Sequence, residues 1–177
     1  MNKFKLVLLT AFISISSAAL AQKTGYISVD QMISIMPEVS RIDSQLQKFQ
    51  VDSIASEYEI IVKDYKYRDS LLGSKDTLAM PKSVRQQHEQ ALQQDAYQLQ
   101  NWQQISQNVV QSKQNQLLAP VYKKVMGAIQ AVAKEKGYTH VYDKSVFVIA
   151  PPGDDLLPAV AARLKVSVPK ELQIGLQ

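Results

Sequence analysis

Residues 86–116 read QQHEQALQQDAYQLQNWQQISQNVVQSKQNQ and hold 13 of the 21 glutamines of this 177-residue chain. The order repeats every seven residues. Two neighbouring heptad columns are uncharged and polar throughout: Gln86, Gln93, Gln100, Gln107 and Gln114, and beside them Gln87, Gln94, Asn101, Asn108 and Asn115. The apolar residues fall in other columns, at Val84, Ala91 and Ile105, at Leu92 and Leu99, and at Trp102 and Val109. This repeat predicts a long α-helix with a polar face and a packing face, and argues against an aggregating glutamine tract.

The helix that contains this run is predicted to extend over residues 81–136. Proline suits the first turn of a helix, and Gly137 ends the pattern. Upstream, residues 38–72 contain no glycine or proline, and their apolar residues follow one another mostly at steps of three and four: Val39, Ile42, Leu46, Phe49, Ile54, Tyr58, Ile61, Tyr65 and Leu72. This spacing is typical of a coiled-coil seam. The single step of five, from Phe49 to Ile54, predicts a local break in the register.

The two helices are predicted to fold back on each other at residues 73–80. Gly73 is expected to end the first helix in the left-handed conformation. At ~1.5 Å per residue the helices would be about 50 Å and 80 Å long, so the second would outrun the first. The excess, residues 121–132, is assigned to a separate body, and Pro120 is expected to bend the helix at the junction.

That body is predicted to take its other parts from both ends of the chain. Residues 26–30 and 139–142 are interpreted as strands, and residues 146–150 as a buried strand. A short helical turn over residues 31–36 would end at Pro37. Asp154 or Asp155 is expected to cap a last helix, whose apolar face is Leu156, Leu157, Val160 and Leu164.

The predicted fold class is α+β and predominantly helical: a long antiparallel helical hairpin, or coiled-coil arm, and a small β-containing oligomerisation body. The predicted arm is residues 38–115, with its tip near 73–80, and the predicted body combines residues 22–37 and 116–177. A body of about 80 residues has a thin core, and an isolated two-helix hairpin is marginally stable. Oligomerisation is therefore expected.

Residues 1–21 are predicted to be a signal peptide. Lys3 and Lys5 supply the positive start, an apolar stretch follows, and the small residues at the end suit cleavage near Ala21/Gln22. The formal net charge is +4; without Lys3 and Lys5 the chain keeps 18 basic and 16 acidic groups, a net charge of +2. We expect an exported, periplasmic protein. The absence of cysteine excludes disulfides and cysteine-ligated metal sites.

Classical catalytic motifs are absent from the sequence. The only two histidines, His88 and His140, are far apart and lack a helical or strand companion, so neither is expected to bind a metal. A phosphate-binding loop, a nucleophile elbow and a helical zinc-protease motif are all missing. We therefore expect no enzyme, no metal and no cofactor. Nucleic-acid binding is disfavoured because the charge is modest.

The predicted hairpin tip concentrates positive charge. Between residues 63 and 85 three acidic residues face six basic ones, which are Lys63, Lys66, Arg68, Lys75, Lys82 and Arg85. In an oligomer several such tips would form a basic rim that attracts acidic client segments or anionic lipid headgroups. An ordinary solvated helix end is the alternative interpretation. Tyr67 and Tyr97 lie off the best seam positions and are the candidate apolar contacts for a client.

Four stretches resemble the Skp (OmpH) family of periplasmic chaperones: GYISVD at 25–30, LLAPVYKKV at 117–125, VAKEKGYTHVYD at 132–143 and DDLLPAVAARL at 154–164. The resemblance covers nearly the whole chain after the signal peptide. It implies a homotrimer with a β-barrel-like body and three helical arms around a cavity, in which unfolded outer-membrane proteins are held without ATP. The chain departs from the family in its extension over residues 165–177 and in Pro158, which lies within the predicted last helix.

Three functions remain after this comparison. The first is a trimeric, ATP-independent periplasmic holdase for unfolded outer-membrane proteins. The second is a structural coiled-coil adaptor that docks onto one folded envelope complex. The third is an envelope protein whose tips bind lipopolysaccharide or anionic lipid. All three predict an exported helical protein, and they differ in the chemistry of the partner.

Overall fold

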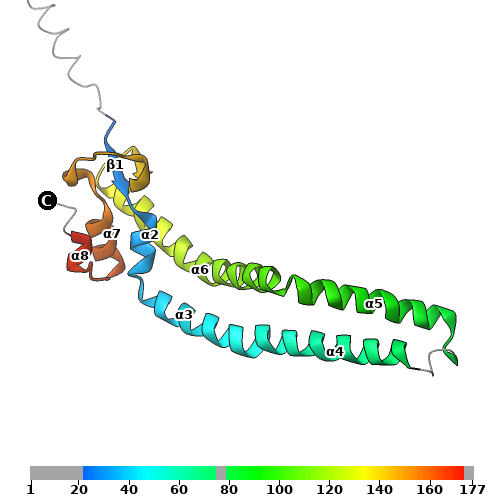
Figure 1. The fold of residues 1–177 in the computed structure, drawn as a ribbon. Coiled ribbons are helices and arrows are strands. Elements are labelled where there is room, and N and C mark those ends of the chain that lie inside the picture. Colours follow the sequence, from blue (N-terminus) through cyan, green and yellow to red (C-terminus); the bar gives the residue numbers. More distant parts are fainter. Residues whose placement is uncertain (1–21, 75–78, 174–177) are drawn as a thin grey trace, which may run out of the picture. The chain divides into compact units, whose positions relative to one another are not determined.

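The computed structural model describes residues 22–74 and 79–173 and divides the chain into two compact units (Figure 1). The hairpin unit is residues 36–124. The composite unit combines residues 22–35 with residues 125–173, and so unites the two ends of the described chain. The predicted signal peptide lies outside the described residues. Helices dominate and the sheet has two strands, so the predicted α+β, predominantly helical class is confirmed.

The first side of the hairpin unit is one helical run in three parts. Helix α3 (Pro37–Phe49) passes into a π-helix, η1 (Gln50–Ile54), and then into α4 (Ala55–Gly73). The π-helix lies where the step between apolar residues is five, from Phe49 to Ile54, instead of three or four, which confirms the predicted register break. Gly73 does not adopt the predicted left-handed conformation: it is the last residue of α4, and the chain leaves the helix through an extended Ser74. The Ser74 N–H donates a hydrogen bond to the Leu71 carbonyl at 3.3 Å.

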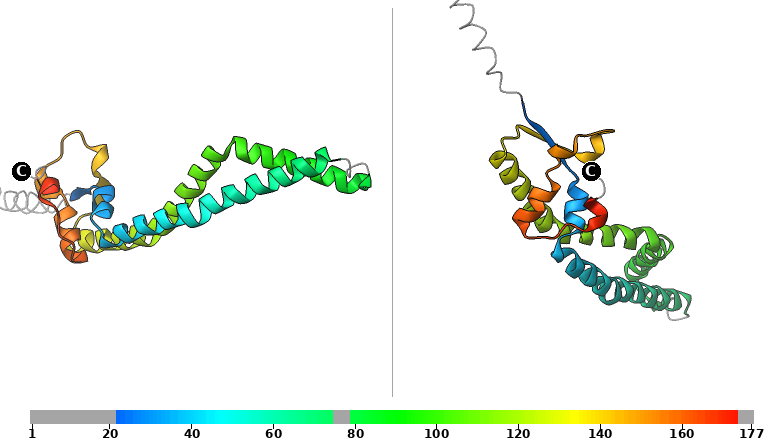
Figure 2. Two further views of the ribbon diagram at one scale, coloured as in Figure 1. Left: turned by 60° about the horizontal axis from the view of Figure 1, so that its bottom comes forward. Right: turned by 90° about the vertical axis from the view of Figure 1, so that its left-hand side faces the viewer.

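The second side is α5 (Lys82–Gln100) followed by α6 (Trp102–Glu135), and it runs beside the first (Figure 2). The prediction of one uninterrupted helix over 81–136 is therefore wrong at Asn101. The Asn101 side-chain amide donates a hydrogen bond to the Tyr97 carbonyl at 2.8 Å, because short polar side chains compete with the helical backbone for its partners. Helix α6 continues through Pro120; the predicted bend there stays a prediction.

The composite unit is built on a parallel pair of strands. Strand β1 (Thr24–Ile27) pairs with β2 (His140–Asp143), with Thr24 opposite His140. The predicted first strand is too long, because its last residues belong to helix α2 (Val29–Ser34). Ser28 caps that helix by accepting a hydrogen bond from the Gln31 N–H at 3.3 Å, which ends the extended backbone.

The end of α6 follows the predicted stop at Gly137. Gly137 has φ +72°, and the N–H groups of Gly137 and Tyr138 bond the carbonyls of Lys134 and Ala133 at 3.3 and 2.9 Å. These two bonds form a Schellman motif. The turn directs the chain from α6 into β2.

The predicted last helix is present as α7 (Leu157–Leu164), followed by the short α8 (Lys170–Gln173). Neither predicted aspartate is the N-cap, which is Leu156 and makes no side-chain cap hydrogen bond. Asp155, one residue earlier, accepts from the Leu157 N–H at 2.8 Å, while Asp154 accepts from the Tyr138 hydroxyl at 3.3 Å. Pro158 lies in the first turn of α7, where proline is tolerated. Apolar side chains from β1, α2, the last part of α6, and α7 with the residue before it form the core of the unit: Tyr26, Ile27, Met32, Val125, Ala128, Ile129, Val132, Leu156, Leu157, Val160 and Ala161.

The predicted buried strand over residues 146–150 is wrong. A 3-10 turn, η3 (Lys144–Val146), follows β2, and Val148 and Ile149 are 100% and 90% exposed. The Asp143 carboxylate accepts a hydrogen bond from the Ser145 N–H at 2.9 Å, so the chain turns away directly after β2. The prediction rested on the apolar composition of the segment, of which only Phe147 packs on the composite unit, against the rings of Tyr26 and Tyr142.

Candidate functional site

The two sides of the hairpin unit meet along the predicted seam. Ile42 and Ile61 are buried, and the other seam residues are half-buried apart from Tyr58. The Tyr58 ring leans on the indole of Trp102, with ring centroids 5.6 Å apart, and so joins α4 to α6. The seam is thin, because two helices alone cannot surround a side chain.

A charged pair crosses the seam between α4 and α5. The Arg68 guanidinium bonds the Asp95 carboxylate across the two helices and the Asp64 carboxylate, at 3.2 Å, on its own helix. Asp95 is buried. This pair was not predicted from the sequence. Two features of the sequence could have indicated it. Asp95 is the only charged residue between Glu89 and Lys113, and it lies seven positions before Trp102, in the same heptad column of the packing face.

Arg68 therefore differs from the other basic residues predicted for the tip. Lys63, Lys66 and Lys82 are exposed, and Arg85 pairs on the surface with Glu89 at 2.9 Å. Lys75 lies outside the described residues. The positive charge that remains available for a partner is on the exposed lysines, while the Arg68 charge is used within the hairpin.

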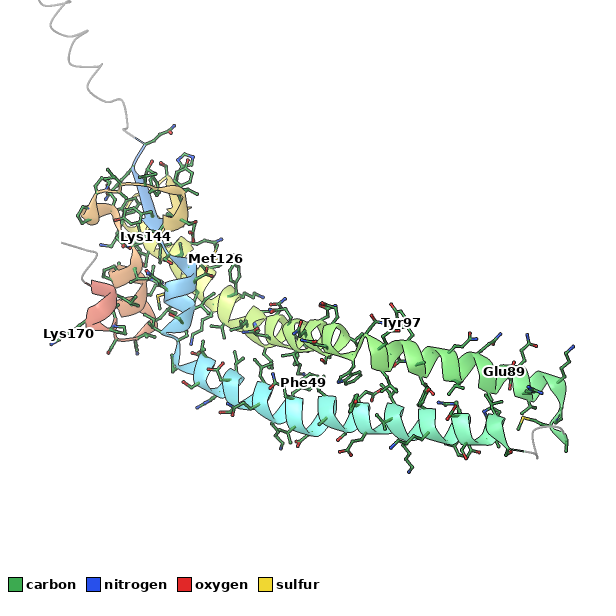
Figure 3. The ribbon with its side chains drawn as sticks, viewed as in Figure 1. Phe49, Glu89, Tyr97, Met126, Lys144 and Lys170 are labelled. Carbon is green, nitrogen blue, oxygen red and sulfur yellow. The ribbon has the colours of Figure 1, made fainter. Side chains whose placement is uncertain are left out.

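The two tyrosines predicted to contact a client are both on the surface. Tyr67 is 62% exposed on α4, and Tyr97 is 64% exposed on α5, where Figure 3 shows its ring pointing away from the seam. Other large apolar residues of the hairpin unit are exposed as well: Val51, Tyr58, Ile60, Val84, Val109 and Tyr122. On the second side Tyr97 and Val109 lie among glutamines, and on α4 the exposed side chains lie among charged residues.

A second ion pair joins the far ends of the two sides. Lys124 Nζ lies 2.5 Å from Glu38 Oε1, and the hydrogen bond from Lys124 lowers the pKa of the Glu38 carboxyl. The other carboxylate oxygen of Glu38 is buried without a hydrogen-bond partner in the described chain. A small hollow of about 280 Å³ lies beside the pair, with Ile42, Leu117 and Val121 in its lining.

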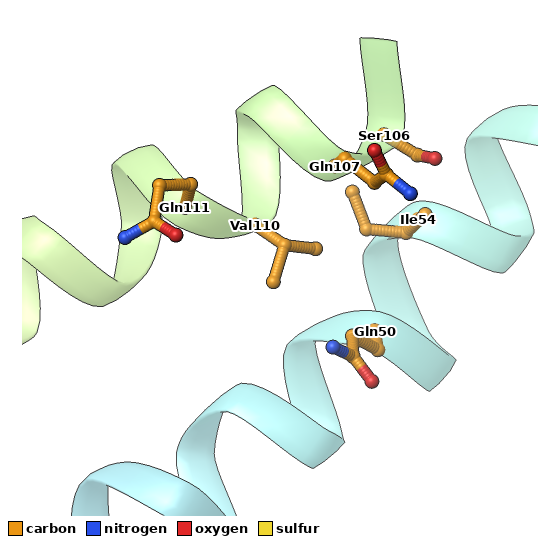
Figure 4. A pocket seen from close by; sticks show the side chains of 6 residues that line it. All are labelled: Gln50, Ile54, Ser106, Gln107, Val110 and Gln111. Atoms are coloured by element: carbon orange, nitrogen blue, oxygen red, sulfur yellow. The ribbon is translucent and has the colours of Figure 1, made fainter. Parts of the chain in front are cut away.

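A larger groove opens between the two sides at the π-helix. Its volume is about 580 Å³, and Figure 4 shows Ile54 and Val110 directed into the gap from opposite helices. Gln50, Ser106, Gln107 and Gln111 complete the lining. None of these six side chains is ionisable, so the groove is a neutral surface of aliphatic and amide groups.

The described residues contain no group of three or more side chains suited to hold a metal ion. His140 is exposed and its Nδ1 lies 3.2 Å from the Thr139 hydroxyl; His88 is half-buried on α5. Over residues 22–74 and 79–173, no helix has the length and apolar character needed to cross a bilayer.

Comparison with known proteins identifies a family and solved structures of similar fold. Residues 23–164 match the model of the family described as outer membrane protein (OmpH-like). Curated proteins gave no match. A crystal structure from Caulobacter crescentus CB15, of an OmpH-like protein proposed in its description as an outer membrane chaperone, superposes with a TM-score of 0.50 at 18% identity, covering 83% of this chain and 86% of that one. The match over most of the chain, together with the shared fold, establishes that this protein belongs to the OmpH-like family.

Proposed function

We propose that this protein is an ATP-independent holdase chaperone of the periplasm, which binds unfolded outer-membrane proteins between the arms of a homotrimer and prevents their aggregation. Membership of the OmpH-like family and the chaperone description of the Caulobacter protein support this role. The proposal includes no catalytic step, no cofactor and no nucleic acid.

The observation that carries the proposal is the surface of the hairpin unit. Tyr67, Tyr97 and Val51 are exposed on both sides of the hairpin unit; Tyr97 lies among uncharged glutamines, whereas Tyr67 lies between Lys66 and Arg68. A surface of this kind makes many weak contacts with differing sequences, whereas a partner of fixed structure is usually bound through one contiguous apolar patch. Weak binding to many sequences is what a holdase needs.

The homotrimer is supported by the exposed segment after β2. Val146, Val148 and Ile149 are exposed, and Phe147 between them packs on Tyr26 with ring centroids 5.6 Å apart. Exposed apolar residues beside a sheet of only two strands favour association with further copies. We expect the double substitution Val148→Asp with Ile149→Asp to lower the mass measured by light scattering towards that of one chain. Ser167→Asp, at another exposed site of the composite unit, is the matched control.

The basic rim is proposed to consist of the exposed lysines, Lys63, Lys66 and Lys82, with Arg85 and Lys75 near them in sequence. In an oligomer these charges would add and attract acidic client segments. The same charges favour the second candidate function, binding of lipopolysaccharide or anionic lipid. Reversing Lys63, Lys66, Lys82 and Arg85 to glutamate would abolish binding to anionic vesicles while leaving the oligomer intact, if lipid binding is the main role.

The test of the main proposal is aggregation of an unfolded outer-membrane β-barrel protein on dilution from urea, followed by light scattering. Near-stoichiometric protein should suppress the aggregation, and the pair Tyr67→Ser and Tyr97→Ser should weaken suppression more than a control pair of surface changes, Gln86→Ser and Gln93→Ser. No suppression at a threefold excess would refute the holdase. Recovery of a single stoichiometric folded partner from envelope extracts would instead support the adaptor.

A further inference from the structure

The groove at the π-helix is a bounded site rather than a general separation of the helices. On one side of it Tyr58 and Trp102 hold the helices together, and on the other side Lys113 lies over the Phe49 ring, 5.6 Å from its centroid. Between these two cross-helix contacts the seam opens to a volume of about 580 Å³. Volumes of this size are typical of binding pockets in proteins, which occupy roughly 300–1,000 Å³.

The π-helix explains why the seam opens here. A π-helical turn contains one more residue than an α-helical turn, and such turns are found frequently at functional sites. In η1 the extra residue places Phe49 and Ile54 five positions apart, and Val51 between them is exposed, so no apolar side chain fills the seam in this interval. The opposite helix presents Ser106 and Gln107 to the same space, and these residues do not fill it either.

The lining has unused hydrogen-bonding capacity. The side-chain amides of Gln50 and Gln107 make no hydrogen bond to any residue that the structure describes. The Gln111 amide nitrogen donates to Gln114 and Asn115, at 3.3 and 3.1 Å, which leaves the Gln111 carbonyl oxygen as an acceptor. Each free amide offers donors and an acceptor together, the same pair of groups that a peptide backbone presents.

These properties select among possible occupants. A charged segment would lose hydration and find no ion-pair partner in the lining; Lys113, at the edge of the groove, lies over Phe49 and bonds Gln116. An acyl chain would cover the amides of Gln50, Gln107 and Gln111 without bonding them. An extended, uncharged peptide satisfies both requirements: its backbone bonds the amides, and alternate side chains reach Ile54 and Val110.

We propose that this groove binds one extended, uncharged segment of an unfolded chain, of the alternating aliphatic and polar pattern found in membrane β-strands. The inference rests on the proposed holdase function and assigns a specific part of client recognition to it. The exposed tyrosines and lysines contact the client broadly, whereas the groove recognises backbone and alternating side chains locally.

The test measures binding of a fluorescent, uncharged peptide of about ten residues, alternating valine and serine, to the full chain in its native oligomeric state. Gln107→Glu places a charge in the groove and is expected to raise the Kd about tenfold. Gln103→Glu, an exposed site one turn away on the same helix that does not line the groove, should change it by less than about twofold. Circular dichroism and mass in solution verify that both variants keep the fold and assembly.

Three outcomes would overturn the inference. The first is a similar Kd for the parent, Gln107→Glu and Gln103→Glu. The second is tighter peptide binding by Gln107→Leu, which would assign the groove to an apolar ligand. The third is a photo-crosslink from a label on Gln107→Cys to another copy of the chain in the absence of peptide. Aggregation assays with a whole client protein distinguish these outcomes from failure of the holdase function. If the protein suppresses aggregation but the groove variants bind the peptide as the parent does, only the groove proposal is refuted.

Discussion

The cross-seam pair of Arg68 and Asp95 provides the sharpest test of how the hairpin is held together. Replacing either residue by leucine removes the same interaction, yet the two changes should differ in cost. Arg68 keeps a second partner, Asp64 at 3.2 Å, when Asp95 is removed. Asp95 has no partner other than Arg68 among residues 22–74 and 79–173, so Arg68→Leu leaves a buried carboxylate unpaired.

The size of each effect follows from burial. The Asp95 side chain is 12% exposed and the Arg68 side chain 23%. Breaking a fully buried pair from one side costs ~3–5 kcal/mol. Partial exposure reduces this, and we expect about 2 kcal/mol for Arg68→Leu. For Asp95→Leu we expect less than about 1 kcal/mol, because the guanidinium reaches Asp64 and water while leucine adds apolar area to the seam. The double variant should match the parent or exceed it.

Thermal unfolding followed by far-UV circular dichroism measures these differences, at one protein concentration because assembly contributes to stability. For a chain of this size ~1 kcal/mol corresponds to roughly 2–4 °C, so Arg68→Leu should lower the Tm by about 4–8 °C. The double-mutant cycle then gives the coupling of the pair. If Asp95→Leu destabilises as much as Arg68→Leu, the pair is not asymmetric and the burial argument is wrong.

Three further predictions concern the composite unit, each measured by chemical or thermal unfolding. Gly25→Ala should destabilise by about 1–3 kcal/mol, because a Cβ atom there would overlap the Leu156 side chain; equal stability would contradict that packing. Lys165→Gly should stabilise by about 1 kcal/mol, since Lys165 has φ +58°; a loss would show that the lysine side chain matters more. Hydrogen bonds from Ser145 lower the pKa of Asp143, so Asp143→Asn should be less stable than the parent above about pH 4, with the difference disappearing as the pH falls through the folded-state pKa. A difference independent of pH would exclude the carboxylate as its source.

The hairpin was largely predictable because helical periodicity is a local property. Steps of three and four, the position of Gly137 and the absence of glycine from residues 38–72 predict two long helices. The interruption at Asn101 was not predictable from the heptads, because Asn101 is a regular member of the polar heptad column that runs from Gln87 to Asn115. Its effect depends on a side-chain hydrogen bond to Tyr97, which competes with the helix only weakly and is decided by the local geometry.

The composite unit was harder to predict because its order depends on contacts between distant segments. The pairing of β1 with β2 joins residues more than a hundred positions apart. Residues 146–150 have strand-like composition, but a strand needs a neighbour, and the described chain supplies none. For the candidate site, the exposure of Tyr67 and Tyr97 agreed with their positions off the seam, whereas the use of Arg68 inside the hairpin depends on Asp95, a partner 27 positions away.

The π-helix connects the irregular apolar step in the sequence with the groove in the structure. In an α-helix each residue turns the chain by about 100°, so a step of five would move Ile54 about 140° away from the face that carries Phe49. The wider π turn absorbs most of this rotation and returns α3 and α4 to one common seam. The same turn lengthens the interval between large apolar side chains and leaves the groove. The irregular step therefore preserves the packing of the hairpin and opens the groove, although a step of four would have given a regular and more continuous seam.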